Sequence, residues 1–338
     1  MTQDIQKLIG QMLLIGAVLT FHAQRASATK YAGEFMSLGV GARALGMGGA
    51  FVAVANDASA AFWNPAGLTQ LDCREVSVMH AEQFAGMVTY DWLSYIHLQQ
   101  AGVQPIRLGL SLMRLGVEDI PITALPDESQ PLNPLTNRPY VAHWASDAEY
   151  ALLVSFARQG EGSLAWGGNV KVLRKSVDEH TAWGLGVDVG LLFRPRERLS
   201  LGLNLQNATT TLVAWDNGTR ETIFPTAKLG GAYALTIDRL HGVLTPAIDM
   251  DVQFEGRTFG SQFHWKQLSA DVRMGVEYWF ERMFAVRIGR DDMGRFSAGA
   301  GFKLHHVTRS LRHAAIDFAY LSKGELDTTY RLSASVGL

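Results

Sequence analysis

The chain has 338 residues, of which 47% are hydrophobic, and its 30 basic and 32 acidic side chains give a formal net charge of −2. This balance lacks the basic surplus that marks most nucleic-acid-binding proteins, so no nucleic-acid partner is expected. The single cysteine, Cys73, excludes an internal disulfide.

The first residues predict an export signal. Lys7 gives a weakly positive start, and the apolar run from 8 to 21 contains only two polar residues. This run is shorter than the roughly 20 residues that a membrane-spanning helix needs. Residues 26–28 (Ala-Ser-Ala) fit the small-residue site of a signal peptidase. We therefore expect residues 1–28 to be a cleaved signal peptide and the mature chain to begin at Thr29.

From residue 74 onward, apolar residues alternate with small or polar residues. Leu199, Leu201, Leu203 and Leu205, for example, are separated by serine, glycine and asparagine. A helix would scatter these leucines around its surface, whereas a β-strand places them all on one face. Fourteen segments follow this pattern, many of them 9–13 residues long, which is the length of a tilted membrane-crossing strand. They lie near 74–81, 88–99, 105–117, 147–159, 162–176, 181–195, 198–207, 224–238, 241–254, 269–281, 283–291, 294–306, 311–322 and 328–338.

Most connections between these segments are short, and three are longer. Residues 118–146 include five prolines, and residues 207–223 and 255–268 form two further excursions. Short turns at one end and longer loops at the other are typical of transmembrane β-barrels.

The alternation allows two kinds of β-protein, a soluble sandwich or barrel and a membrane barrel. A soluble protein would place its large apolar residues inside and its charges outside. Here the second face of each strand consists of small residues and scattered charges, which would pack a poor core. The reverse arrangement places leucine, valine and aromatic residues against outer-membrane lipid and lines the lumen with small or polar residues. We therefore predict an all-β fold, a transmembrane antiparallel β-barrel of about 14 strands over residues 73–338. Its expected luminal charges are Arg107, Lys171, Asp188, Lys228, Asp271, Arg273, Glu277, Arg287 and Arg331.

Residues 29–72 break the alternation and predict a compact plug. Glycines are frequent before a run of small residues, and they permit tight turns and close backbone packing. Residues 58–62 can form a short helix capped by Asn56 or Asp57, which Asn64 and Pro65 end. A Gly-x-Gly-x-x-Ala match at 39–44 resembles a dinucleotide fingerprint but lacks the preceding strand and crossover helix that such a site needs.

Residues 39–68 (GVGARALGMGGAFVAVANDASAAFWNPAGL) closely resemble the N-terminal signature of the PorV/PorQ family, within the FadL-like outer-membrane proteins. The resemblance implies 14 strands, an N-terminal hatch lodged in the lumen, location in the outer membrane and insertion by the barrel insertion machinery. The final residue, Leu338, departs from the aromatic residue with which such barrels usually end. The implied hatch residues are Gly39, Gly41, Arg43, Gly46, Gly48, Gly49, Asn56, Asp57, Asn64 and Pro65.

Motifs of catalysis and metal binding are sparse. The sequence has no Gly-x-Ser-x-Gly elbow, and the adjacent His305 and His306 would point to opposite faces of a strand. We therefore expect no catalytic residue, no metal site, no cofactor and no enzymatic activity.

Two functions remain open. The resemblance implies passage of small hydrophobic molecules, and five apolar residues of the plug form a possible ligand pocket, although core packing explains them equally well: Phe35, Met47, Phe51, Phe62 and Trp63. Some PorV/PorQ relatives instead serve the type IX secretion system and receive secreted polypeptide cargo, for which residues 118–146 would present a surface. Arg43 is expected to pair with an acidic residue of the barrel wall.

Overall fold

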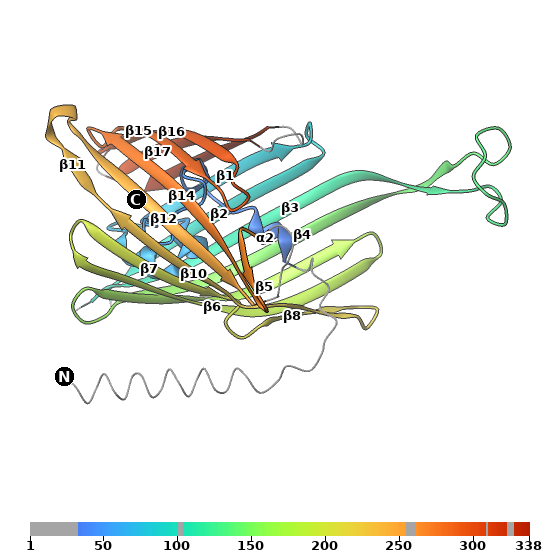
Figure 1. Cartoon of the computed structure of the whole chain (residues 1–338), viewed down its shortest axis with the longest axis horizontal. Helices are drawn as coiled ribbons and strands as arrows, with labels where there is room; N and C mark the ends of the chain where they lie inside the picture. The colour runs from blue at the N-terminus through green and yellow to red at the C-terminus, as the bar shows by residue number, and fades with distance from the viewer. Residues whose placement is uncertain (1–32, 101–103, 255–260, 309, 323–327) are drawn as a thin grey trace.

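The computed structural model describes residues 33–100, 104–254, 261–308, 310–322 and 328–338, so the expected signal peptide lies outside the described residues. Fourteen described strands form a closed antiparallel barrel in which each strand pairs with the next and β18 pairs with β1 (Figure 1). This confirms the predicted fold class. No helix in these ranges is long and apolar enough to cross a membrane. The wall strands are β1 (Glu75–Gln83), β2 (Val88–Gln99), β3 (Ile106–Ala124), β4 (Tyr140–Gln159), β5 (Leu164–Val177), β6 (His180–Arg196), β7 (Leu199–Gln206), β10 (Thr226–Tyr233), β12 (Gly242–Gln253), β14 (Leu268–Phe280), β15 (Phe284–Arg290), β16 (Phe296–His305), β17 (His313–Leu321) and β18 (Thr329–Gly337).

Shorter elements extend the wall at its two ends. β8 (Thr211–Trp215) pairs with β6 and β9 (Arg220–Ile223), so residues 207–223, predicted as a connection, contain a hairpin. β11 (Leu235–Ile237) pairs with β12 and is followed by the 3-10 helix η2 (Asp238–Leu240), and β13 (Phe263–Trp265) pairs with β14. We call the end with the turns 160–163, 197–198 and 281–283 the turn end, and the opposite end, with β8 and β9, the loop end.

The barrel is apolar outside and polar inside. On β6, Trp183 and Leu185 are 58% and 61% exposed, whereas Asp188 is 2% exposed. All nine charged residues expected in the lumen are buried. Because successive side chains of a strand point to opposite faces, this reversal relative to a soluble protein follows directly from the alternating sequence.

The predicted connection 118–146 is wrong in its extent. β3 and β4 continue beyond the rim of the barrel as a two-stranded arm, which leaves only residues 125–139 as the loop (Figure 1). A register shift follows Val117, where Asp119 adopts a φ of +57°. Pro121 lies in the arm opposite Trp144. A proline is tolerated there because a two-stranded ribbon has an outer edge on each strand where no ladder hydrogen bond is required.

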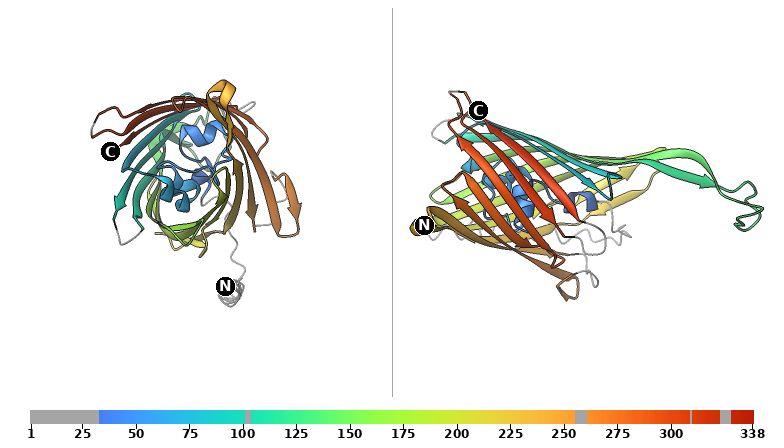
Figure 2. Two further views of the ribbon diagram at one scale, coloured as in Figure 1. Left: turned by 90° about the vertical axis from the view of Figure 1, so that its left-hand side faces the viewer. Right: turned by 90° about the horizontal axis from the view of Figure 1, so that it is seen from above.

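Residues 33–72, which we call the luminal segment, lie inside the barrel (Figure 2). They contain the short helices α2 (Glu34–Ser37), α3 (Ala42–Gly46) and α4 (Ala60–Trp63) and the 3-10 helix η1 (Pro65–Gln70). The helix predicted over 58–62 is therefore shifted by up to two residues. The Asp57 carboxylate accepts hydrogen bonds from the backbone N–H and the hydroxyl of Ser59. These bonds form a local turn that competes with a helix starting at residue 58.

Candidate functional site

Small residues of the wall allow the luminal segment to touch the strands directly. The turn at 46–49 lies against β14 and β15, where a Cβ at Gly275 or Gly289 would collide with the backbone of Met47 or Gly48. Gly190 of β6 makes room in the same way for Asn64 and Pro65. These strand glycines thus provide close contact between wall and segment.

Arg43 joins the luminal segment to the wall. Its guanidinium donates two hydrogen bonds to Glu277 of β14, at 2.8 and 2.7 Å, and one each to Asn56 at 2.6 Å and Asp57 at 3.0 Å. The expected pairing of Arg43 with an acidic wall residue is confirmed. Arg287 of β15 donates to Glu277 at 2.7 Å from the other side. Glu277 is therefore shared by two cations, a charge-assisted arrangement that compensates its burial.

A second carboxylate holds the middle of the segment. Asp249 of β12 is buried, and one of its oxygens accepts the backbone N–H groups of Phe51 at 2.6 Å and Val52 at 2.8 Å. Farther along, the Asn64 amide donates to the carbonyls of Val52 at 2.9 Å and Leu191 at 3.0 Å. The Asp249 carboxylate therefore binds segment N–H groups that lie outside any helix or sheet, and Asn64 links the segment to the backbone of β6.

Each implied hatch residue has a definite place. Gly39, Gly41, Gly48 and Gly49 all have φ between +67° and +78°, which favours glycine. Gly46 packs against the backbone of Gly299. The remaining residues, Arg43, Asn56, Asp57, Asn64 and Pro65, lie in the contacts described above.

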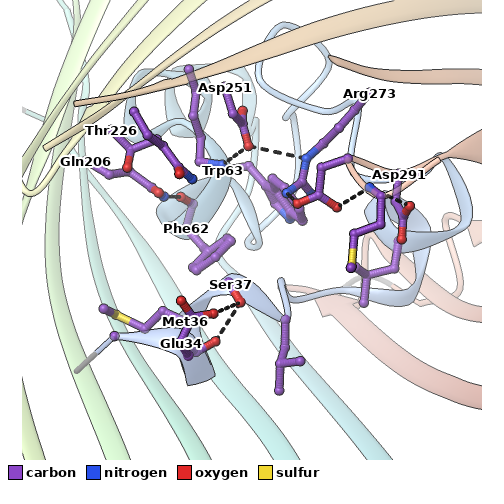
Figure 3. Close-up of a pocket in the computed structure, with 18 of the residues that line it drawn as sticks. Glu34, Met36, Ser37, Phe62, Trp63, Gln206, Thr226, Asp251, Arg273 and Asp291 are labelled. Atoms are coloured by element: carbon purple, nitrogen blue, oxygen red, sulfur yellow. Dashed lines mark hydrogen bonds and ion pairs between the residues drawn. The ribbon is translucent and has the colours of Figure 1, made fainter. Parts of the chain in front are cut away.

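A cavity of about 680 Å³ lies between the luminal segment and the loop end. Its apolar lining includes Met36, Leu38, Phe62 and Trp63 of the segment, with Phe224 from the connection between β9 and β10 (Figure 3). Of the five predicted pocket residues, Phe62 and Trp63 line this cavity. The other three are packed in the core and do not line it: Phe35, Met47 and Phe51.

The same cavity has a charged side, which the prediction of a hydrophobic pocket did not include. Lys171 pairs with Asp188 at 2.8 Å, and Arg273 pairs with Asp292 at 2.9 Å and with Asp251 at 3.3 Å. Four of these residues (Lys171, Asp188, Asp251 and Arg273) are luminal residues of β5, β6, β12 and β14, and Asp292 comes from the turn between β15 and β16. The alternating pattern could place the strand residues inside the barrel but could not place them around one cavity. In the described part of the chain, no group of three or more His, Cys, Asp or Glu side chains is arranged to hold a metal ion.

Comparisons with known proteins agree with this architecture. Residues 14–105 match an uncharacterised protein family (UPF0164), and no curated protein matches the chain. The fold is similar to that of the Pseudomonas putida toluene transporter TodX, with a TM-score of 0.58 and 12% identity over 89% of this chain and 99% of that one. The Ralstonia pickettii toluene transporter TbuX gives 0.55 and 10% over 88% and 97%. A Pseudomonas aeruginosa FadL homologue gives 0.51 and 12% over 87% and 97%. At these identities the likeness shows a shared FadL-like barrel fold.

Proposed function

We propose that this chain is a non-enzymatic FadL-like channel of the outer membrane that passes small hydrophobic molecules, with the luminal segment as its hatch. The observation that carries the proposal is the cavity of about 680 Å³, which lies at the loop end and has the luminal segment as its floor. Its volume falls within the range of small-molecule sites. TodX and TbuX, whose barrels have a similar fold, are toluene transporters.

The apolar outer surface supports a position in a bilayer. Large apolar side chains on the strands are exposed, including Leu110 at 53%, Leu185 at 61% and Ile288 at 55%. A closed barrel leaves no strand edge without partners, which hydrocarbon requires because it offers no hydrogen bonds. In this proposal the signal peptide directs export, the insertion machinery places the barrel, and the chain belongs to the PorV/PorQ family.

In the proposed mechanism a hydrophobic molecule enters at the loop end and rests against Phe62 and Trp63. Passage beyond that point requires the luminal segment to move, because its contacts with the wall close the lumen. The pair between Arg43 and Glu277 is then one of the interactions that must break. A molecule that binds the open arrangement more tightly than the closed one would shift the hatch toward opening.

The transport role is tested by native mass spectrometry on protein extracted gently from its own membrane, together with uptake of a hydrophobic fluorophore by proteoliposomes. An adduct of small mass that added hydrocarbon displaces supports transport. Thr226→Trp, which fills the cavity, should reduce both adduct and uptake, whereas Thr236→Trp, on exposed β11 outside the cavity, should change neither. Equal uptake by empty liposomes and by the wild type would overturn the proposal.

A role in type IX secretion is the second candidate, and the arm formed by β3 and β4 favours it. The arm projects beyond the barrel wall (Figure 1). It exposes Trp144 at 62% and Tyr140 at 54%, and the loop at its tip exposes Leu135 at 94%. Exposed aromatic residues are common where proteins bind polypeptides. A stoichiometric polypeptide partner in the same mass spectra, lost on removal of residues 122–142 and without a small adduct, would favour this role over transport.

A further inference from the structure

The turn end of the barrel carries exposed arginines around its rim. They come from turns and strand ends along most of the chain, so they are distributed around the wall and not along one strand. Fewer exposed acidic residues accompany them: Asp72, Glu161, Glu197, Asp238 and Glu281. The arginines are Arg74, Arg158, Arg194, Arg196, Arg198, Arg239, Arg282 and Arg312.

These arginines differ from those of the lumen in their partners. Arg43, Arg273 and Arg287 each make ion pairs inside the barrel. Among the described residues, no ion pair within 4.0 Å involves the arginines of the turn-end rim. Arg194 does donate a hydrogen bond to the Gln70 amide oxygen at 3.0 Å. In the described part of the chain, the rim therefore presents more exposed cations than anions, and its arginines are not held in ion pairs.

Aromatic side chains fix the depth of the rim relative to the apolar surface. Trp166, Phe193, Phe280 and Phe284 are exposed on the strand ends beside the rim, each by 40% or more. Tryptophan and other aromatic residues concentrate at the level of lipid headgroups, where one side of the ring is apolar and the other is wet. In the bilayer position proposed above, the arginines beside and beyond these aromatic residues lie at the level of lipid phosphates.

One surface pocket combines both features. Arg158 of β4 is the strand partner of Trp166 of β5, and Trp166 lies 5.2 Å from Phe156 between ring centroids. Arg158 and Trp166 line a pocket of about 500 Å³ together with the turn Gly160–Gly162. The carboxylate of Glu161 in that turn repels an anion, so an anionic group of a ligand must bind on the side of the Arg158 guanidinium. An indole beside a guanidinium suits a lipid whose acyl chain follows the aromatic surface while its phosphate remains in water.

We propose that the arginines of the turn-end rim bind the phosphate groups of anionic phospholipids in the leaflet on that side, with Arg158 and Trp166 forming one defined site. Arginine suits this role because its planar guanidinium donates two parallel hydrogen bonds to a phosphate. The inference rests on the bilayer position proposed above, and it adds a lipid preference that the transport role does not require.

The test uses the full chain in nanodiscs of phosphatidylcholine with and without phosphatidylglycerol, followed by native mass spectrometry of retained lipid. The wild type should retain phosphatidylglycerol in preference to phosphatidylcholine. Arg158→Gln should lower that preference by about fivefold, the value of one arginine near an anionic surface, with a smaller effect at high salt. Arg138→Gln, on the loop-end arm, removes the same charge far from the rim and should leave the preference unchanged.

Three outcomes would overturn the inference. Equal retention of the two lipids by the wild type would show that the rim has no preference. An equal loss in Arg138→Gln would show that net charge alone decides retention. Release of phosphatidylglycerol by millimolar inorganic phosphate would show that free phosphate is the ligand. Failure to insert even into neutral nanodiscs would instead refute the bilayer position, so the two proposals fail in distinguishable ways.

Discussion

Arg43 and Glu277 are 234 positions apart in the sequence and form a two-hydrogen-bond pair inside the barrel, with N–O distances of 2.8 and 2.7 Å. The Arg43 guanidinium also lies 5.2 Å from the centre of the Phe51 ring, and Arg287 of β15 donates a further hydrogen bond to Glu277. This cluster connects the luminal segment to β14 and β15, the two strands that its turn at 46–49 also touches. The pair is consequently placed to control whether the segment stays in contact with the wall.

Arg43→Ala should loosen the segment and raise the leak conductance of single channels in planar bilayers. Removing one partner of a buried ion pair typically lowers stability by about 3 kcal/mol or more. The loss should lie near the lower end here because Arg287 still compensates Glu277. Arg43→Lys keeps the charge but loses the two-pronged geometry, so its conductance should fall between those of the wild type and Arg43→Ala.

Arg220→Ala supplies the matched control, since this exposed arginine of β9 lies outside the lumen cluster. Glu277→Gln should raise the leak as well, and the double variant should add little to either single change because both remove one interaction. An unchanged conductance in Arg43→Ala would show that the pair does not hold the segment.

Gly289→Ala should disturb the contact between β15 and the backbone of the turn at 46–49. A Cβ at Gly289 would collide with Met47 and Gly48, so the turn at 46–49 must move away from β15. Overpacking of this kind typically lowers stability by about 1–3 kcal/mol. Gly231→Ala is the control, because the nearest atom to its added Cβ is 3.8 Å away. Equal thermal midpoints of the two variants would contradict the expected contact.

The strand pattern was predictable because the barrel separates two environments along its whole wall. β2 was expected at 88–99 and spans Val88–Gln99, since lipid-facing and luminal residues alternate without interruption there. The arm beyond Val117 was not predicted, because both of its faces meet solvent and the alternation disappears. A pattern that reports burial gives no signal where neither face is buried.

The site was predictable only in part, for a similar physical reason. The sequence indicated that Arg43 would meet an acidic wall residue, but the choice of Glu277 depends on how the wall strands stagger and close. Asp249 gave no signal of its role, because its partners are the backbone N–H groups of Phe51 and Val52, which any sequence possesses. The cavity likewise results from the register of several strands.

Asp249→Ala should release the middle of the luminal segment without unfolding the barrel. The variant removes two hydrogen bonds to a charged group, each worth about 1.5–3 kcal/mol. Amide hydrogen exchange should therefore accelerate at least about tenfold in peptides covering residues 47–54, because a change of 1.4 kcal/mol corresponds to a factor of ten. Asp216→Ala, in an exposed turn at the loop end, should leave these peptides unchanged. Uniform acceleration across the wall strands would indicate global destabilisation instead.

Cys73 should be unreactive in the folded protein despite its neighbours. Its sulfur lies 3.8 Å from Nδ1 of His313, whose other nitrogen lies 3.2 Å from Glu75, an order that resembles a nucleophile, a base and an orienting acid. Burial nevertheless raises the pKa of the Cys73 thiol to about 11. A thiol with that pKa holds about one hundredth of the thiolate of an unperturbed thiol near pH 8. Alkylation by iodoacetamide at pH 8 should thus be at least about 100-fold slower in the folded protein than after unfolding, and it should accelerate as the pH rises toward 11. Fast labelling of the folded wild type that His313→Ala abolishes would show instead that the histidine activates the thiol.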